Sequence, residues 1–322
     1  MAIAATLVMA TGAANASAAG LTGAGSTLVA PLMANWINGF EIKEGIAVKY
    51  GAVGSGAGIA QITARTVDFG ASDAPLTPEQ ASACNGCIQV PWALSATGLG
   101  FNVPGVKKLN LSGPIIAGIY FGKITKWNDP KIASQNSGVN LPSSTISICH
   151  RSDESGTTKN FTAFLADYSD EWKNGPGVDK SVKWPSGTGA KGNDGVAACI
   201  KQNENSIGYV EQAYALANNF TFASVKNKAG NFVAPTLAGA AAAGVGLTIP
   251  DDLRISTIDA PGAQAYPITA LTFLLVYQDV CKAGKDEQGA KRLKAWLDYA
   301  EGDGQAVAGE LQYAKLPDDL HS

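Results

Sequence analysis

The sequence predicts an α/β fold, because strand-like and helix-like segments alternate along its 322 residues. Residues 92–103 and 270–277 form long apolar runs, which makes them the best candidates for buried strands. Residues 145–150 alternate apolar and polar side chains, as a strand does, and residues 161–168 carry aromatic and Leu side chains at helical spacing. A late helix is expected around residues 293–300, where Leu and Trp recur at the same spacing.

The length and composition indicate a globular protein of about two domains. Hydrophobic residues make up 46% of the chain and charged residues 16%, values that allow large buried cores. The net charge of −3 favours neither nucleic acid nor an anionic membrane surface as a partner. We find no internal repeat. Residues 223–263 are rich in Ala and Gly and weakly periodic, and we expect them to cover a surface of the second lobe.

The first 16 residues have features of an export signal. Residues 2–10 are a short apolar run, and Ala14 to Ala16 has the small-x-small form of a cleavage site, although the usual basic residues before the run are missing. The run is too short to span a membrane, and no cysteine lies near this end to carry a lipid anchor. The sequence therefore predicts a soluble, exported protein.

Two glycine clusters each lead into a helix-like segment. Residues 23–27 precede apolar side chains at helical spacing over 29–40, and residues 54–58 precede a second short helix, which Ser55 is placed to cap. Glycine lets the backbone approach a ligand closely because it has no Cβ. The N–H groups at a helix start have no partner within the helix and carry the positive end of its dipole.

The most informative segment is the loop at residues 151–158, between the predicted strand at 145–150 and the helix that follows. It begins with Arg151, which we expect to be the one fixed cation at the site, and continues with hydroxyl side chains and a glycine. An arginine beside the N-terminus of a helix forms a site for a tetrahedral oxyanion. The alternative interpretation is that Ser155 or Thr157 is only an N-cap.

A fourth motif, VDFGASDAPL at residues 67–76, completes an ordered set. Together with the two glycine clusters and the loop at 151–158, it closely resembles the phosphate-binding protein of bacterial high-affinity phosphate ABC transporters. The resemblance covers nearly the whole chain in consistent order and continues through residues 121–129, 182–185, 191–196, 207–211, 266–269 and 316–317.

The resemblance implies the type II fold of periplasmic solute-binding proteins, with two lobes joined by two crossing strands and the ligand in the cleft. Lobe one would comprise residues 17–93 and 266–322, and lobe two residues 94–265, with crossings near 92–97 and 262–269. The implied function is capture of inorganic phosphate by a monomer in the periplasm and its delivery to the permease and ATPase components of a membrane transporter. Neither catalysis, nor a cofactor or metal, nor nucleic acid is expected.

The same resemblance assigns ligand roles to eight residues. They comprise donors at the three helix starts, one cation and one acceptor, namely Thr27, Leu28, Ser55, Asp73, Arg151, Ser155, Gly156 and Thr157. Asp153 would orient Arg151 without touching the ligand. Asp73 would select the ligand, because a carboxylate only accepts hydrogen bonds and therefore needs a proton on the anion. Phosphate near neutral pH carries such a proton, whereas sulfate has none.

Two residues depart from the family pattern. Leu28 stands where phenylalanine is frequent, which is tolerable because the backbone N–H is used there. Glu154 stands where many members have glycine, and a carboxylate in an anion loop should repel the ligand unless it points to solvent.

Two other functions remain open at this point. The first is binding of another tetrahedral oxyanion; Asp73 argues against sulfate and molybdate, while arsenate would be nearly indistinguishable from phosphate. The second is hydrolysis of phosphate esters in the same cleft, which requires a metal cluster or an activated nucleophile that we do not find. The glycine pattern at 187–192 formally matches a dinucleotide loop, but no apolar strand precedes it, and we expect it to open a helix at Asn193 instead.

Five cysteines suit an oxidising compartment. Cys84 and Cys87 could form a tight disulfide, bind metal or act in redox exchange, and we favour the disulfide. Cys149, Cys199 and Cys281 are expected to be small buried hydrophobic residues, with a Cys149–Cys199 pair as the alternative.

Overall fold

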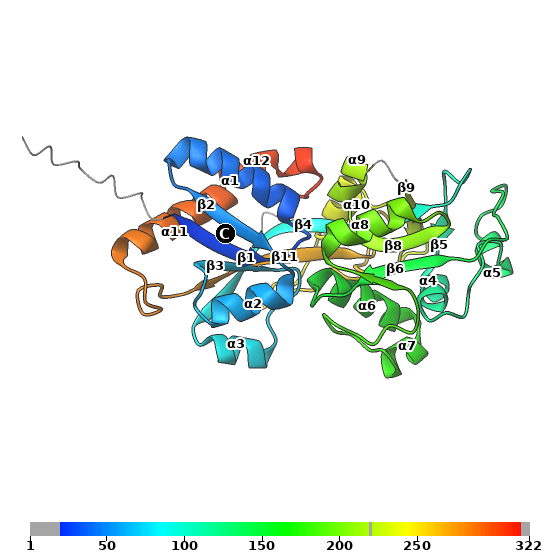
Figure 1. Cartoon of the computed structure of the whole chain (residues 1–322), viewed down its shortest axis with the longest axis horizontal. Coiled ribbons are helices and arrows are strands. Elements are labelled where there is room, and N and C mark those ends of the chain that lie inside the picture. The colour runs from blue at the N-terminus through cyan, green and yellow to red at the C-terminus, as the bar shows by residue number, and fades with distance from the viewer. Residues whose placement is uncertain (1–19, 219–220, 317–322) are drawn as a thin grey trace, which may run out of the picture.

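A computed structural model describes residues 20–218 and 221–316 of the chain (Figure 1). The predicted export signal at residues 1–16 lies outside the described residues, as do the outer ends of both segments assigned to lobe one.

One continuous sheet runs through the molecule in the strand order β2-β1-β3-β11-β4-β8-β6-β7, while β5 and β10 join it through β9. Pairing is parallel among β1, β2 and β3 and among β6, β7 and β8, whereas β11 and β4 run antiparallel to their neighbours. The strands are β1 (Leu21–Gly25), β2 (Val48–Ala52), β3 (Phe69–Ser72), β4 (Cys87–Asn102), β5 (Asn110–Leu111), β6 (Ser147–Arg151), β7 (Thr188–Ala190), β8 (Ser206–Glu211), β9 (Thr221–Lys226), β10 (Phe232–Val233) and β11 (Thr269–Tyr277).

Helices cover both faces of this sheet (Figure 1), which confirms the α/β prediction. They are α1 (Ala30–Glu44), α2 (Ser55–Thr63), α3 (Pro78–Cys84), α4 (Gly113–Tyr120), α5 (Pro130–Ala133), α6 (Gly156–Tyr168), α7 (Asp170–Asn174), α8 (Gly192–Gln202), α9 (Ala213–Asn218), α10 (Leu237–Ala243), α11 (Glu287–Glu301) and α12 (Asp303–Ala308), with a short 3₁₀ turn at Gly309–Leu311.

The elements form two groups that lie side by side in Figure 1. We call β1–β3, α1–α3, α11 and α12 the first half, and β5–β10 with α4–α10 the second half. The two longest strands run between them. β4 pairs with β11 through Ala96 and with β8 from Thr97 onward, so one strand contributes to both halves.

Each half has its own aromatic packing. In the first half, Trp36 of α1 packs edge to face on Trp92 at the near end of β4, with ring centroids 5.0 Å apart. In the second half, Phe161 of α6 stacks on Tyr209 of β8 at 4.4 Å, and this contact fixes α6 against the sheet. Rigid packing of α6 matters for function because its first turn carries the loop predicted to bind an anion.

The two best strand predictions are confirmed, although β4 begins earlier than expected, at Cys87. Their continuous apolar patterns reflect a position in the middle of the sheet, where β11 is buried along its whole length. The late helix is confirmed as α11. The region at 223–263 is weakly periodic because it consists of short pieces, β9, β10 and α10, joined by turns.

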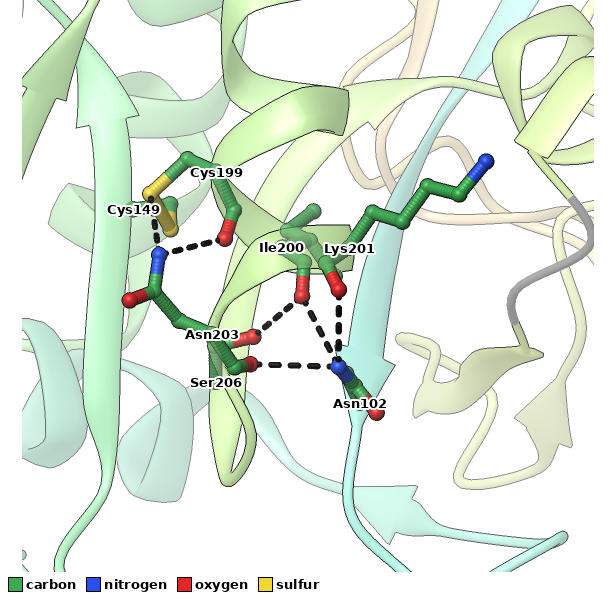
Figure 2. The surroundings of a disulfide bond; sticks show 7 residues. All are labelled: Asn102, Cys149, Cys199, Ile200, Lys201, Asn203 and Ser206. Atoms are coloured by element: carbon green, nitrogen blue, oxygen red, sulfur yellow. Dashed lines mark hydrogen bonds between the residues drawn. A yellow bond between two sulfur atoms is a disulfide. The ribbon is translucent and has the colours of Figure 1, made fainter.

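Two disulfides brace the chain. Cys84 pairs with Cys87, as predicted, with their Cα atoms 5.6 Å apart. Cys149 of β6 pairs with Cys199 of α8, so the preferred expectation of two unpaired buried thiols was wrong and the alternative is confirmed (Figure 2). This bond joins the strand that ends at the predicted anion loop to the helix behind it. Cys281 is a free thiol but is exposed, which corrects its predicted burial.

Candidate functional site

The loop between β6 and α6 has the local structure that its sequence predicts. β6 ends at Arg151 and α6 begins at Gly156, with Ser155 as its N-cap. The Ser155 hydroxyl accepts a hydrogen bond from the Thr158 N–H at 3.1 Å, so Ser155 is an N-cap in fact. Its cap role and its predicted ligand role are compatible, because a hydroxyl that accepts one hydrogen bond can still donate another.

Arg151 is held by Asp153 through a two-point contact. Arg151 Nε donates to Asp153 Oδ1 at 2.8 Å and Nη2 donates to Oδ2 at 2.5 Å. The Arg151 side chain is only 1% exposed, so the guanidinium lies inside the molecule. Burial alone would raise the pKa of Asp153, but hydrogen bonds from Arg151 and from Gly192 N–H outweigh it and lower that pKa below its usual value. The pair therefore stays charged and fixes the direction of the remaining Arg151 N–H groups.

The first glycine cluster forms the end of β1 and the beginning of the turn that leads into α1. α1 begins at Ala30, and the Leu28 N–H donates to the Ser26 hydroxyl at 3.0 Å. Thr27 Oγ1 accepts hydrogen bonds from the N–H and the side-chain amide of Asn193, at 3.1 and 3.0 Å. Thr27 belongs to the first half and Asn193 to α8 of the second, so the two halves meet at this turn.

Ser55 does not cap α2, which corrects the sequence prediction. The N-cap is Gly54, whose φ of +99° lies in the region that favours glycine, and no side chain caps it. Ser55 is instead the first helical residue, and its hydroxyl lies between the halves. Ser55 Oγ accepts from the N–H groups of Asp73 and Gly156, both at 3.2 Å, and donates to Asp73 Oδ2 at 3.3 Å.

Asp73 follows β3 and is 2% exposed. Its carboxylate accepts hydrogen bonds from the hydroxyls of Ser26 and Ser55, both of the first half. Thr157 of the second half donates to Asp73 Oδ2 at 3.5 Å. Burial raises the pKa of Asp73 to about 6, against the opposing effect of Ser26 and the Arg151 charge. The carboxyl group is therefore ionised at neutral pH and protonates in mild acid.

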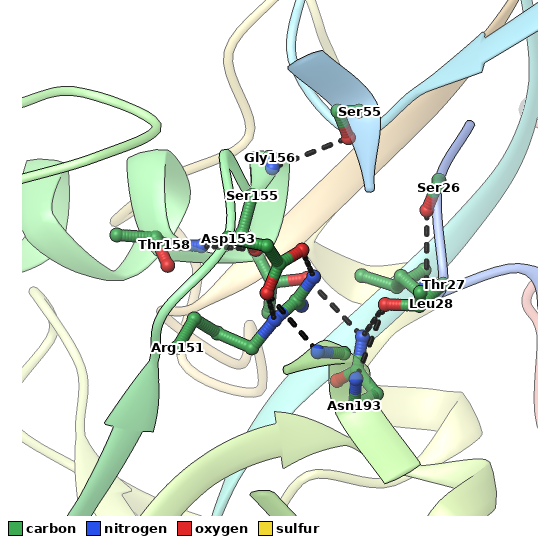
Figure 3. A network of polar contacts seen from close by, with 12 residues as sticks. Ser26, Thr27, Leu28, Ser55, Arg151, Asp153, Ser155, Gly156, Thr158 and Asn193 are labelled. Carbon is green, nitrogen blue, oxygen red and sulfur yellow. Dashed lines mark hydrogen bonds and ion pairs between the residues drawn. The ribbon is translucent and has the colours of Figure 1, made fainter. Parts of the chain in front are cut away.

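The structure brings all eight predicted ligand residues to the junction of the two halves. Figure 3 shows Arg151 and Asp153 beside the start of α6, with Ser55 and the turn at Ser26–Leu28 approaching from the first half. Contacts across the junction are direct, and the Gly56 N–H donates to the Glu154 carbonyl at 3.0 Å. Glu154 is exposed, and its side chain lies against Gly56 in the first turn of α2, where it would collide with a Cβ on Gly56.

Sequence reasoning missed Ser26 and Asn193. Ser26 binds Asp73 and the Leu28 N–H, and it stands inside the first glycine cluster, where its residue type could have drawn attention. Asn193 links Thr27 to Thr157, because its side-chain amide donates to the hydroxyls of both residues, to Thr157 Oγ1 at 3.4 Å. The Asn193 Oδ1 atom accepts a hydrogen bond from the Glu211 N–H. Its place in the motif at 191–196 was a signal for this role.

A second buried cation was also missed, so Arg151 is not the one fixed cation near the site. Lys180 is 5% exposed, and its Nζ donates across the junction to Gln80 Oε1 at 3.4 Å. Its backbone carbonyl accepts from the Ser155 N–H and thus supports the anion loop. Burial and the neighbouring Lys159 charge lower the pKa of Lys180 to about 8.

The loop at 187–192 opens a helix, as predicted. β7 lies within it and pairs with β6, and α8 begins at Gly192. Within residues 20–218 and 221–316, no three His, Cys, Asp or Glu side chains gather as a metal site would require. No helix in that part of the chain is long and apolar enough to cross a bilayer.

Gly156 is a point where the halves touch too closely for a larger side chain. A Cβ at this position would lie 2.6 Å from Ser55 Oγ and 2.8 Å from Asp73 Cβ. We expect Gly156→Ala to leave each half folded but to hold the halves apart. The closed form should then be destabilised by roughly 1–3 kcal/mol, the cost typical of overpacking. Calorimetry should then show phosphate binding weakened by about 5- to 150-fold. Small-angle scattering should show a larger radius of gyration with phosphate than the wild type has.

Gly51→Ala is the matched control for this substitution, because a Cβ there would meet its nearest neighbours at 3.8–3.9 Å, an ordinary contact. Wild-type affinity in both variants would contradict the close approach at Gly156.

The fold and the site define the class of protein. The molecule has two α/β halves that share long central strands, and a buried arginine lies at a helix start between them. This arrangement is that of a periplasmic solute-binding protein. The family model that matches describes a PBP superfamily domain and covers residues 10–303.

Two solved structures have the same fold. A putative phosphate ABC transporter substrate-binding protein with bound phosphate from Clostridium perfringens has a TM-score of 0.68 at 20% identity, covering 93% of this chain and 100% of that one. A high affinity periplasmic phosphate-binding protein, PfluDING, bound with phosphate, has a TM-score of 0.78 at 23% identity, covering 94% and 92%.

Curated relatives are more similar in sequence. The phosphate-binding protein PstS of Xylella fastidiosa (strain 9a5c) is 41% identical over 307 residues, covering 93% of this chain and 82% of that protein. PstS of Haemophilus influenzae is 40% identical over 319 residues, covering 95% and 92%. The chain belongs to the PstS family of phosphate-binding proteins.

Proposed function

We propose that this protein captures inorganic phosphate in the periplasm and delivers it, as a monomer, to the permease and ATPase components of a membrane transporter. The observation that carries the proposal is the position of Asp73, a buried carboxylate surrounded by hydroxyls from both halves and close to a buried arginine. The donors suit a tetrahedral oxyanion, and the single acceptor suits one that carries a proton.

The proposed ligands are the eight residues named from the sequence. Thr27 and Leu28 belong to the turn before α1, Ser55 and Asp73 lie beside them, and the rest come from the loop after β6, namely Arg151, Ser155, Gly156 and Thr157. Asp153 orients Arg151 through its two-point contact. We propose that the halves are the predicted lobes, with lobe one at residues 17–93 and 266–322 and lobe two at residues 94–265. Because the ligand set is divided between them, we also propose that the lobes close around the anion.

Selection of the anion follows from hydrogen-bond chemistry. An ionised Asp73 accepts a hydrogen bond from the protonated oxygen that phosphate carries near neutral pH, whereas sulfate would place one acceptor against another. Sites built around a specific hydrogen bond reject ligands that lack it, because the buried polar group is then left unpaired.

A paired experiment tests the proposal. Calorimetry should show saturable binding of free phosphate, while an assay with phosphate monoesters should show no turnover. Ester hydrolysis at a significant rate would support the enzymatic alternative. Absence of phosphate binding in the intact chain would refute the proposal.

The Asp73 pKa predicts a dependence of selectivity on pH. Below its pKa of about 6, the Asp73 carboxyl group carries a proton and can donate to a sulfate oxygen. Sulfate affinity should therefore rise, and the phosphate-to-sulfate affinity ratio fall, as the pH is lowered from about 8 to about 5. Titrations of both anions across this range measure the effect, with Asp73→Asn as the control in which the rise in sulfate affinity should be absent. A sulfate affinity that does not change with pH in the wild type would contradict the role of Asp73.

A further inference from the structure

Asn160 lies on α6 one helical turn after Gly156, so both residues face the same side of the helix. That side faces the first half at Asp73. Gly156 approaches the Asp73 main chain so closely that a Cβ on Gly156 would lie 2.9 Å from Asp73 N. The Asn160 side chain extends the same contact by one turn.

The Asn160 amide makes a short hydrogen bond across the junction. Its Nδ2 donates to the Asp73 carbonyl at 2.6 Å. On the other side of the same residue, the Asp73 N–H donates to Ser55 Oγ at 3.2 Å. Both main-chain polar groups of Asp73 are therefore engaged, the N–H by its own half and the carbonyl by the opposite half.

The surroundings leave this hydrogen bond without tight packing on one side. A cavity of about 150 Å³ borders it, lined from the second half by Lys159, Asn160 and Ala163 and elsewhere by residues that include Pro75 of the first half and Phe273 of β11. The amide thus spans a gap between the halves. Opening of the junction must break this bond, and Asn160 itself is not among the eight proposed ligands.

We propose that Asn160 is a positioning residue that holds the Asp73 main chain against the anion loop in the closed form and so slows release of the anion. This inference rests on the proposed function. A contact that forms only after closure should affect the dissociation rate and not the rate of encounter. It should also leave the stability of the ligand-free protein unchanged.

The test uses Asn160→Ala and Asn160→Leu in the intact chain, with inorganic phosphate as the ligand and stopped-flow kinetics as the readout. Ala opens the cavity to water, which can replace the lost donor, whereas Leu fills the space and leaves the Asp73 carbonyl unpaired. We expect the dissociation rate to rise about 3- to 10-fold, more for Leu than for Ala, as loss of one hydrogen bond predicts. The association rate should stay within about twofold.

Two controls separate this role from a structural one. Asn174→Ala removes an exposed amide from α7 of the same half and should release phosphate at the wild-type rate. The melting temperature without phosphate should not fall in either Asn160 variant, because Ala and Leu favour helices more than Asn does.

Three results would overturn the proposal. They are wild-type dissociation rates in both Asn160 variants, a loss that appears in the association rate, or a drop in ligand-free stability that accounts for the weaker binding. A wild-type protein that does not bind phosphate would overturn the proposed function and this inference with it. Normal phosphate binding by wild type and variants alike would overturn the Asn160 role alone.

Discussion

Replacing Arg151 with Ala should weaken phosphate binding by about 2–5 kcal/mol, the range for removing one member of a buried charged contact. Arg151 is 3% exposed and directed by Asp153, so its charge acts in a site that water does not screen. The substitution also leaves the Asp153 carboxylate without its cation. Calorimetric titration with phosphate measures the loss, and circular dichroism checks that the fold is kept.

Lys183→Ala is the matched control, since it removes an exposed positive charge from the same half. It should bind phosphate as the wild type does. An Arg151→Ala protein whose affinity stays within about twofold, far below the expected loss, would show that the anion binds elsewhere.

Replacing Asp73 with Asn should change selectivity more than affinity. A site built around a specific hydrogen bond can reject a ligand lacking it by a factor of roughly 10⁴–10⁵. An amide can donate where the carboxylate only accepts, so sulfate rejection should weaken more than phosphate binding does. Titration of both anions into both proteins gives the two affinity ratios.

If Asp73 had only a structural role, a different result would be expected. Its carboxylate accepts hydrogen bonds from Ser26 and Ser55, and a role limited to these bonds would make Asp73→Asn less stable to heat without changing the ratio. An unaltered phosphate-to-sulfate affinity ratio would therefore show that Asp73 does not select between the two anions.

The fold could be predicted from the sequence wherever local pattern and position in the sheet agree. β4 and β11 are buried in the middle of the sheet, so their apolar runs identify them without further context. The start of α6 was equally clear, because Ser155 caps it and the alternating strand β6 comes just before. The eight proposed ligands were placed by family resemblance, since their convergence depends on contacts between distant segments.

Features that depend on such distant contacts were beyond local reasoning. Ser55 stands where a cap is expected, yet Gly54 takes that position and the Ser55 hydroxyl bonds to Asp73 and Gly156. Lys180 and Asn160 show no local signal, because their partners Gln80 and Asp73 are 100 and 87 residues away in the chain. The Cys149–Cys199 pair, with a separation of 50 residues, could be proposed but not chosen.

The central claim is that this protein binds phosphate and rejects sulfate through an ionised Asp73. Calorimetric titration of the wild-type protein with each anion at about pH 7.5, above the Asp73 pKa of about 6, tests it most directly. Phosphate should saturate a single site, and sulfate should give no binding heat even at roughly 10⁴-fold higher concentration. Comparable binding of the two anions under these conditions would contradict the account.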